Sequence, residues 1–195
     1  MAAAGTNDVP QTAPAAGATG RDPRMVELAP GHIVFDKLLA IAHLWALDAK
    51  PVTLQSQMRK ENSPDGKSCV WALLVVSESK KQIRVFDWSG IMAADAHTPG
   101  VHDSPPNAFD SKNPNTQPFD PALFKVDSSD ALKTANTKAG KDVWSTNGVK
   151  QSFRLKWDKD KKHLAWTVSY GVNEKEITHT ESVDASKNVS LPAEK

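Results

Sequence analysis

Two histidines lie close together in the sequence with acidic neighbours. The segment 95–103 begins and ends with aspartate and contains His97 and His102. Imidazole and carboxylate groups are both acceptable zinc ligands, so a metal enzyme is one hypothesis for this chain. The segment also lies in a Pro-rich region, which is typical of a solvated loop. We favour the loop interpretation and therefore predict no metal site and no cofactor.

The common sequence signatures of catalysis are missing. The chain has no phosphate-binding loop, no Gly-x-Ser-x-Gly turn and no His-Glu-x-x-His helix, which are the patterns of nucleotide binding, acyl transfer and zinc proteolysis. The oxygen-bearing side chains of Asp110, Asn113 and Asn115 do not have the spacing of an EF-hand loop. The acidic residues fall mainly in turns and on polar strand faces, where a solvated role is the default. We expect a chain that is not an enzyme.

Tryptophan is unusually frequent, with six residues against one tyrosine. Four indoles fall on apolar helix or strand stripes and are predicted core residues: Trp45, Trp71, Trp157 and Trp166. Trp88 ends a predicted strand beside Ser89, and Trp144 lies in a polar loop. We predict that these two are partly exposed and that they bind a partner or ligand.

Composition excludes several classes of partner. The chain has 195 residues, with 24 Lys and Arg against 23 Asp and Glu, for a formal net charge of +1. Nucleic acids and anionic membranes are bound by clustered positive charge, so both are unexpected partners. The longest apolar stretch, 38–47, is about half of the ~20 residues that a membrane-spanning helix needs. At this length the chain can bury a core without disulfides, and Cys69, the single cysteine, is predicted to be a buried core thiol.

The first 24 residues are rich in Ala, Gly, Thr and Pro. Such a segment cannot bury enough apolar area to offset its conformational entropy, so it is predicted to be disordered. It lacks the charged and apolar regions of a signal peptide. It is similar to the spacer behind the lipid-modified cysteine of bacterial lipoproteins, or behind the cleavage point of a secreted protein. That similarity implies an extracytoplasmic location, periplasmic or secreted, with a lipid anchor upstream as one form of it. A cytoplasmic location is the alternative.

Hydrophobic periodicity predicts an α+β fold. We expect two repeats of one helix packed on a three-stranded antiparallel sheet, behind the disordered tail. The expected helices are 35–49 and 128–140, and the expected strands are 52–59, 69–76, 82–88, 152–157, 164–170 and 177–183. These elements divide the chain into a tail (1–24), a first repeat (25–90), a Pro/Asn/Asp-rich connection (91–127) and a second repeat (128–195). Ile41 and Leu44 widen the apolar face of the first helix, which predicts that neighbours cover this helix on both sides.

The second repeat carries the residues of a family resemblance. Its helix contains Asp130-Ala131-Leu132, its first strand Phe153-Arg154-Leu155, and its second strand the run from Trp166 to Tyr170. These residues resemble tandem PepSY-like modules, the small helix-and-sheet units of secreted bacterial proteins and peptidase propeptides. The repeat order is also similar to that of the beta-lactamase inhibitor proteins, which present an aromatic sheet face to an enzyme. Either resemblance implies binding or inhibition of another protein, and neither implies catalytic residues.

The leading hypothesis is therefore a non-enzymatic, secreted or envelope-associated bacterial protein that binds a protein partner. The expected surface is an aromatic sheet face or the groove between the two repeats. The alternative is a small-molecule or glycan-binding module that uses exposed indoles as stacking platforms. The sequence leaves open the partner, the oligomeric state and whether the two repeats share one sheet.

Overall fold

The computed structural model describes residues 26–192 and has an α+β fold, as predicted. Its helices are α1 (Gly31–Trp45), α2 (Ser128–Ala139) and α3 (Lys141–Trp144), with short 3-10 turns η1 (Pro114–Thr116) and η2 (Pro121–Leu123). None of the described helices combines the length and apolarity that a bilayer crossing requires. The tail predicted to be disordered, 1–24, lies outside the described residues.

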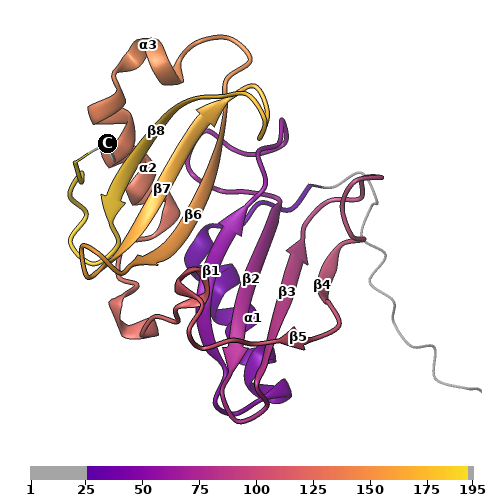
Figure 1. The fold of residues 1–195 in the computed structure, drawn as a ribbon. Helices are drawn as coiled ribbons and strands as arrows, with labels where there is room; N and C mark the ends of the chain where they lie inside the picture. Colours follow the sequence, from indigo (N-terminus) through magenta and orange to yellow (C-terminus); the bar gives the residue numbers. More distant parts are fainter. Residues whose placement is uncertain (1–25, 193–195) are drawn as a thin grey trace, which may run out of the picture.

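All strands belong to one antiparallel sheet (Figure 1). The strands are β1 (Lys50–Ser56), β2 (Val70–Ser77), β3 (Gln82–Ser89), β4 (Gly100–Asp103), β5 (Asn107–Ala108), β6 (Lys150–Asp158), β7 (His163–Gly171) and β8 (Ile177–Asp184). Their order is β4-β3-β2-β1-β6-β7-β8, and β5 also pairs with β3. The predicted strands thus do not form two sheets of three. They share one sheet because β1 pairs with β6 at its centre, with Leu54 opposite Leu155.

The helices cover one face of this sheet (Figure 1). Helix α1 packs on β1, β2 and β3, and α2 packs on β7 and β8. Strand alternation sends one set of side chains toward the helices, and these form a core cluster that spans both halves. At its centre the rings of Trp71 and Trp166 are 6.3 Å apart, and both indoles are fully buried. Their N–H groups donate to the carbonyls of Ala29 and Val126, at 3.0 and 2.7 Å.

Helix α1 is shifted four residues toward the N-terminus of its predicted range. It stops at Trp45 because Ala46 adopts an extended backbone. It begins at Gly31 because distant side chains satisfy its first N–H groups. The Gly31 N–H donates to Ser128 Oγ and the His32 N–H to Asp127 Oδ1, each at 2.9 Å. The start of α2 therefore caps the start of α1.

The outer side of α1 is uncovered, contrary to the sequence-based expectation. Leu44 is 87% exposed, although it was expected to pack against a second neighbour. The apolar residues of this helix that face the sheet, such as Leu38 and Ala42, are fully buried. The sheet therefore covers only one stripe of α1.

The predicted linker 91–127 is more structured than expected. It contributes β4 and β5 to the sheet, both paired with β3. It then returns to the middle of the sheet, where the Phe119 N–H donates to the Pro51 carbonyl at 2.9 Å. Figure 1 shows this return passing in front of β2 and β1, on the side opposite the helices. Strands β4 and β5 have four and two residues. They are too short to show an alternating hydrophobic pattern, so the sequence did not predict them.

Candidate functional site

The face of the sheet that points away from the helices is hollowed over β6, β7 and β8. A groove of about 690 Å³ lies there, and we call it the open-face groove. Its floor is made by Arg154, Lys156, Ala165, Thr167 and Ser182, and its rim by residues 157–161 and His163 with Pro114, Asn115 and Leu191. A second, smaller hollow of the described residues lies at the other half of the sheet.

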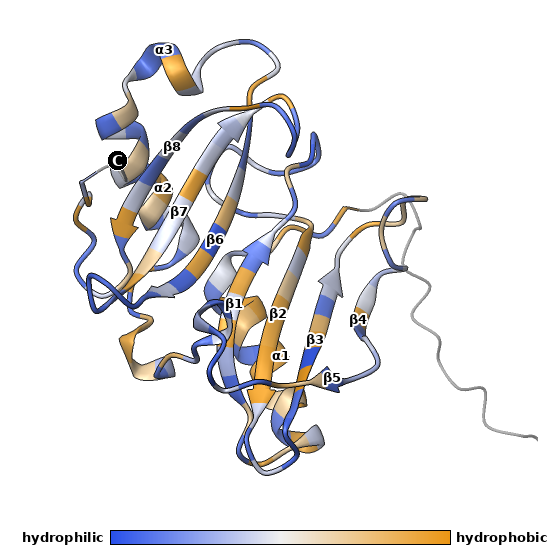
Figure 2. Cartoon of the chain, viewed as in Figure 1, coloured by the Kyte–Doolittle hydropathy of each residue, from blue (hydrophilic) through white to orange (hydrophobic). Residues whose placement is uncertain are grey.

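Strand alternation explains the polar floor of the groove. Phe153 and Leu155 of β6 point into the core and are buried. The alternate residues Arg154 and Lys156 therefore point to the open face. The same alternation in β7 buries Trp166 and leaves Thr167 on the open face. Figure 2 shows the result: hydrophobic and hydrophilic residues alternate along β6, whereas β2 is hydrophobic over most of its length.

The strand register lines up hydrogen-bond donors across the groove. Gln55 lies opposite Arg154, Arg154 opposite Thr167, and Thr167 opposite Ser182. Adjacent strands are about 4.8 Å apart, so these side chains form a continuous row, which we call the donor row. It contains a guanidinium, an amide and two hydroxyls and no carboxylate. Such a row is suited to oxygen acceptors.

The carboxylate nearest the rim is already engaged within the β6–β7 turn. Asp158 accepts from the Lys161 backbone N–H at 2.9 Å, and its carboxylate lies 3.6 Å from Lys161 Nζ and 3.9 Å from His163 Nε2. Burial opposes ionisation of Asp158, but the Lys161 N–H and the charges of Lys161 and His163 outweigh it and lower the pKa of this carboxyl. Asp158 therefore holds the turn.

The two cations on the groove floor have no such partner. Within residues 26–192, no acidic side chain forms an ion pair with Arg154 or Lys156. Arg154 is exposed and Lys156 is half-buried. Their charges are consequently available to a molecule that enters the groove.

The second hollow, of about 360 Å³, lies where β2 begins and β3 ends. It brings together His97 and Asp87, whose Nδ1 and Oδ2 atoms are 3.5 Å apart, and the His97 and His102 rings are 4.7 Å apart. Asp87 was not singled out from the sequence, but it lies opposite His102 across the β3–β4 pairing. Burial raises the pKa of Asp87, while the two imidazoles act against that rise.

These residues do not make a metal centre in the described structure. No group of three His, Cys, Asp or Glu side chains in residues 26–192 is arranged to hold a metal ion. One ring nitrogen of His102 is also engaged, because Nε2 lies 2.7 Å from the Thr98 carbonyl. His102 belongs to β4, so the solvated loop expected around both histidines is wrong for this residue.

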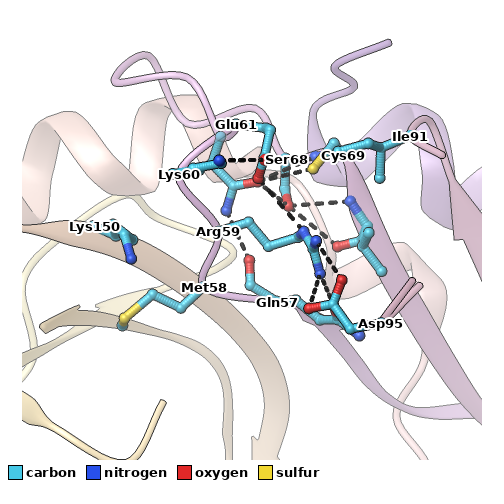
Figure 3. Close-up of polar contacts among 12 residues, drawn as sticks. Gln57, Met58, Arg59, Lys60, Glu61, Ser68, Cys69, Ile91, Asp95 and Lys150 are labelled. Carbon is cyan, nitrogen blue, oxygen red and sulfur yellow. Dashed lines mark hydrogen bonds and ion pairs between the residues drawn. The ribbon is translucent and has the colours of Figure 1, made fainter. Parts of the chain in front are cut away.

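Arg59 fixes the loop beside the second hollow (Figure 3). Its guanidinium donates to both carboxylate oxygens of Asp95, at 2.8 and 3.1 Å, and to Gln57 Oε1 at 3.1 Å. The hydrogen bond from Arg59 lowers the pKa of Asp95. The neighbouring Cys69 is fully buried, and burial raises the pKa of its thiol, as expected of a core cysteine. The Arg59 contacts tie the loop at Asp95 to the segment that follows β1.

The two tryptophans predicted to bind lie in different environments. Trp88 is 3% exposed and belongs to the core, so the expectation that it is partly exposed is wrong. It is buried because Val101 of β4 lies opposite it at the sheet edge. Trp144 is 36% exposed on α3, as expected. The structure does not bring these indoles together in one site, and a binding role for Trp144 stays a prediction.

The residues of the open-face groove were not predicted as a site from the sequence. Arg154 and Lys156 are two cations separated by the single core residue Leu155, and this spacing is a signal that could have found them. Thr167 and Ser182 gave none, since their position beside Arg154 depends on strand register.

Comparison with protein-family models, with curated proteins and with solved structures found no match to this chain. The functional proposal therefore rests on the geometry of the open-face groove.

Proposed function

We propose that this chain is a non-enzymatic protein-binding module and that its partner docks in the open-face groove. The observation that carries this proposal is a wide, polar hollow on a sheet face that no helix covers. Small-molecule sites usually enclose their ligand and are mostly apolar, whereas this groove is open and has a polar floor. The polar floor resembles the rim of a protein interface, where direct hydrogen bonds form.

The sequence-based hypothesis placed the binding surface on an aromatic face of the sheet. The positions of the aromatic residues exclude that face. The large aromatic side chains of the sheet, among them Trp71, Phe153 and Trp166, lie fully or almost fully buried under the helices. They are not accessible to a partner. The polar face opposite them is accessible, so the proposal uses that face. Of the two indoles on which the glycan alternative was based, Trp88 is buried and Trp144 is exposed.

The two-repeat layout is part of the proposal. In each half a helix is followed by three antiparallel strands, and the first strands of the two sets, β1 and β6, pair with each other. This order supports a tandem arrangement like that of PepSY-like modules and beta-lactamase inhibitor proteins. An extracytoplasmic location, with inhibition as one form of binding, belongs to the same proposal.

Site-specific photocrosslinking tests the surface. A photoreactive amino acid at Thr167, in the groove, should form an adduct with a defined protein in the native cell. The same amino acid at Ala40, exposed on α1, is the matched control and should not form it. The purified partner should bind the wild-type chain and the Ala40→Trp variant, but not Thr167→Trp, in which an indole fills the groove. Identical adducts from both positions, or none from Thr167, would count against the proposal.

A further inference from the structure

We propose that the open-face groove recognises an acidic, extended segment of the partner protein, with its carboxylates bound by Arg154 and Lys156. This inference rests on the proposed function and adds the chemistry of the partner. It follows from the charges on the groove floor, from their spacing and from the hydroxyl groups beside them.

The charge of the groove is positive. Four cationic side chains line it, Arg154, Lys156, Lys159 and Lys161, against the two carboxylates of Asp158 and Asp160. Asp158 is held within its own turn by the Lys161 N–H. The groove therefore complements an acidic surface, although the whole chain carries a net charge of only +1.

The spacing of the two floor cations matches a β-strand. Arg154 and Lys156 are two residues apart on β6 and point to the same face, so they are separated by about 6.8 Å along the strand. Side chains on one face of an extended peptide repeat at the same distance. A segment with Asp or Glu at alternate positions therefore presents one carboxylate to each cation.

The donor row adds hydroxyl groups to the part of the groove where Arg154 would bind a carboxylate. Thr167 lies opposite Arg154 on the neighbouring strand, and Ser182 lies opposite Thr167 one strand further on. Their hydroxyl groups can donate to the second oxygen of a bound carboxylate. At the level of Lys156 the neighbour is Ala165, followed by Asp184. The Asp184 carboxylate already accepts from the N–H groups of Ser186 and Lys187, at 2.8 and 3.0 Å. We expect the Arg154 position to be the more selective of the two.

A peptide fits the groove better than a nucleic acid. Single-stranded nucleic acids bind on exposed aromatic platforms that stack with the bases, and the one indole at this groove, Trp157, is partly buried against the core. The Asp158 and Asp160 carboxylates at the rim would also repel a continuous phosphate backbone. An acidic segment avoids this repulsion when its alternate carboxylates end at the Lys156 position, because Asp158 follows on the same face of β6.

Fluorescence anisotropy with a defined probe tests the inference. The probe is a fluorescein-labelled peptide of ten alternating Glu and Thr residues, and the matched probe has Lys in place of Glu. The full chain should bind the Glu peptide at low salt, with affinity falling as salt rises, and should not bind the Lys peptide. The Arg154→Glu/Lys156→Glu variant should bind the Glu peptide about tenfold more weakly or not at all, because two attractions become repulsions.

The matched control is Lys37→Glu/Lys80→Glu, which makes the same change in net charge at exposed sites outside the groove. It should bind the Glu peptide within about twofold of the wild type, since distant exposed charges are screened. Equal weakening by both double variants would overturn the inference, because only net charge would then matter. Preference for single-stranded DNA over the Glu peptide would overturn it as well. Thermal melting shows whether each variant folds. If the Arg154→Glu/Lys156→Glu variant does not fold, the milder Arg154→Gln variant replaces it.

The same variants separate this inference from the proposed function. If the photocrosslinked partner no longer binds Thr167→Trp but still binds Arg154→Glu/Lys156→Glu, the groove is the interface and the acidic chemistry is wrong. If Thr167 forms no partner adduct, the proposed function itself fails, whatever the peptide does.

Discussion

The two halves of the sheet use their open faces differently. In the first half part of this face is apolar, with Leu74 and Val85 side by side, and the returning connection passes across it (Figure 1). Val76 also points away from the helices and is fully buried. In the second half the corresponding face carries Arg154 and Lys156 and is left open. An apolar face must be covered by the chain itself, whereas a charged face can remain in water until a partner arrives.

The hairpin connections differ in the same way. The β1–β2 connection, 57–69, reaches across to the second half, where Asn62 Nδ2 donates to the Gln151 carbonyl at 3.3 Å and the Met58 N–H donates to Glu174 Oε1 at 3.2 Å. The β6–β7 turn, 159–162, is exposed and forms the groove rim. The first connection joins the halves, whereas the second is exposed at the rim of the groove.

The largest predicted effect tests whether the halves are one folding unit. Trp166→Ala should destabilise the chain by about 3–5 kcal/mol, because it removes a buried indole that packs against Trp71 across the two halves. Urea unfolding should show one shifted transition with both far-UV and near-UV signals. Two separate transitions would show instead that the two halves fold independently, as separate domains.

A smaller effect is expected at the junction of the two helices. Ser128 Oγ accepts from the Gly31 N–H at 2.9 Å and donates to the Gly66 carbonyl at 2.8 Å, and the residue is fully buried. Ser128→Ala should therefore cost about 1–2 kcal/mol of unfolding free energy. Ser129→Ala is the neighbouring control and should stay within about 0.5 kcal/mol of the wild type. Equal losses of unfolding free energy in Ser128→Ala and Ser129→Ala would mean that the hydrogen bond from α1 to Ser128 does not stabilise the fold.

The smallest effect concerns a turn of the first half and depends on pH. The Ser79 N–H and the Ser77 hydroxyl donate to Asp48 and lower its pKa to about 2. A folded pKa below the unfolded value, about 3.9, stabilises the protein above pH 4, and this contribution is lost as the pH falls toward 2. Asp48→Asn should thus be less stable than the wild type at pH 5 and approach it near pH 2.

The measurement is the free energy of unfolding by urea at both pH values. Asp160→Asn, at the exposed β6–β7 turn, is the control and should follow the wild type at each pH. A constant difference between Asp48→Asn and the wild type at pH 5 and pH 2 would contradict the role given to this carboxylate.

Periodicity in the sequence was sufficient for most helices and strands. Helix α2 and strands β6, β7 and β8 lie close to their predicted ranges, because each has a repeating apolar stripe and a polar turn at its ends. The short strands β4 and β5 were missed, since two to four residues between prolines carry no period. The candidate site was visible only in part. The strand pattern placed Arg154 and Lys156 on the polar face of 152–157 without marking them as a site, and it gave no sign that His102 pairs with Asp87.

The sequence by itself determined the α+β class, the burial of Trp71 and Trp166 and the outward direction of the groove cations, because these depend on the side-chain period of each element. Only the tertiary structure decided that β1 pairs with β6, that Ser128 caps α1, and that Thr167 and Ser182 stand beside Arg154. These contacts join residues far apart in the chain. Their partners are chosen by how complete elements pack and register, and no local pattern records that choice.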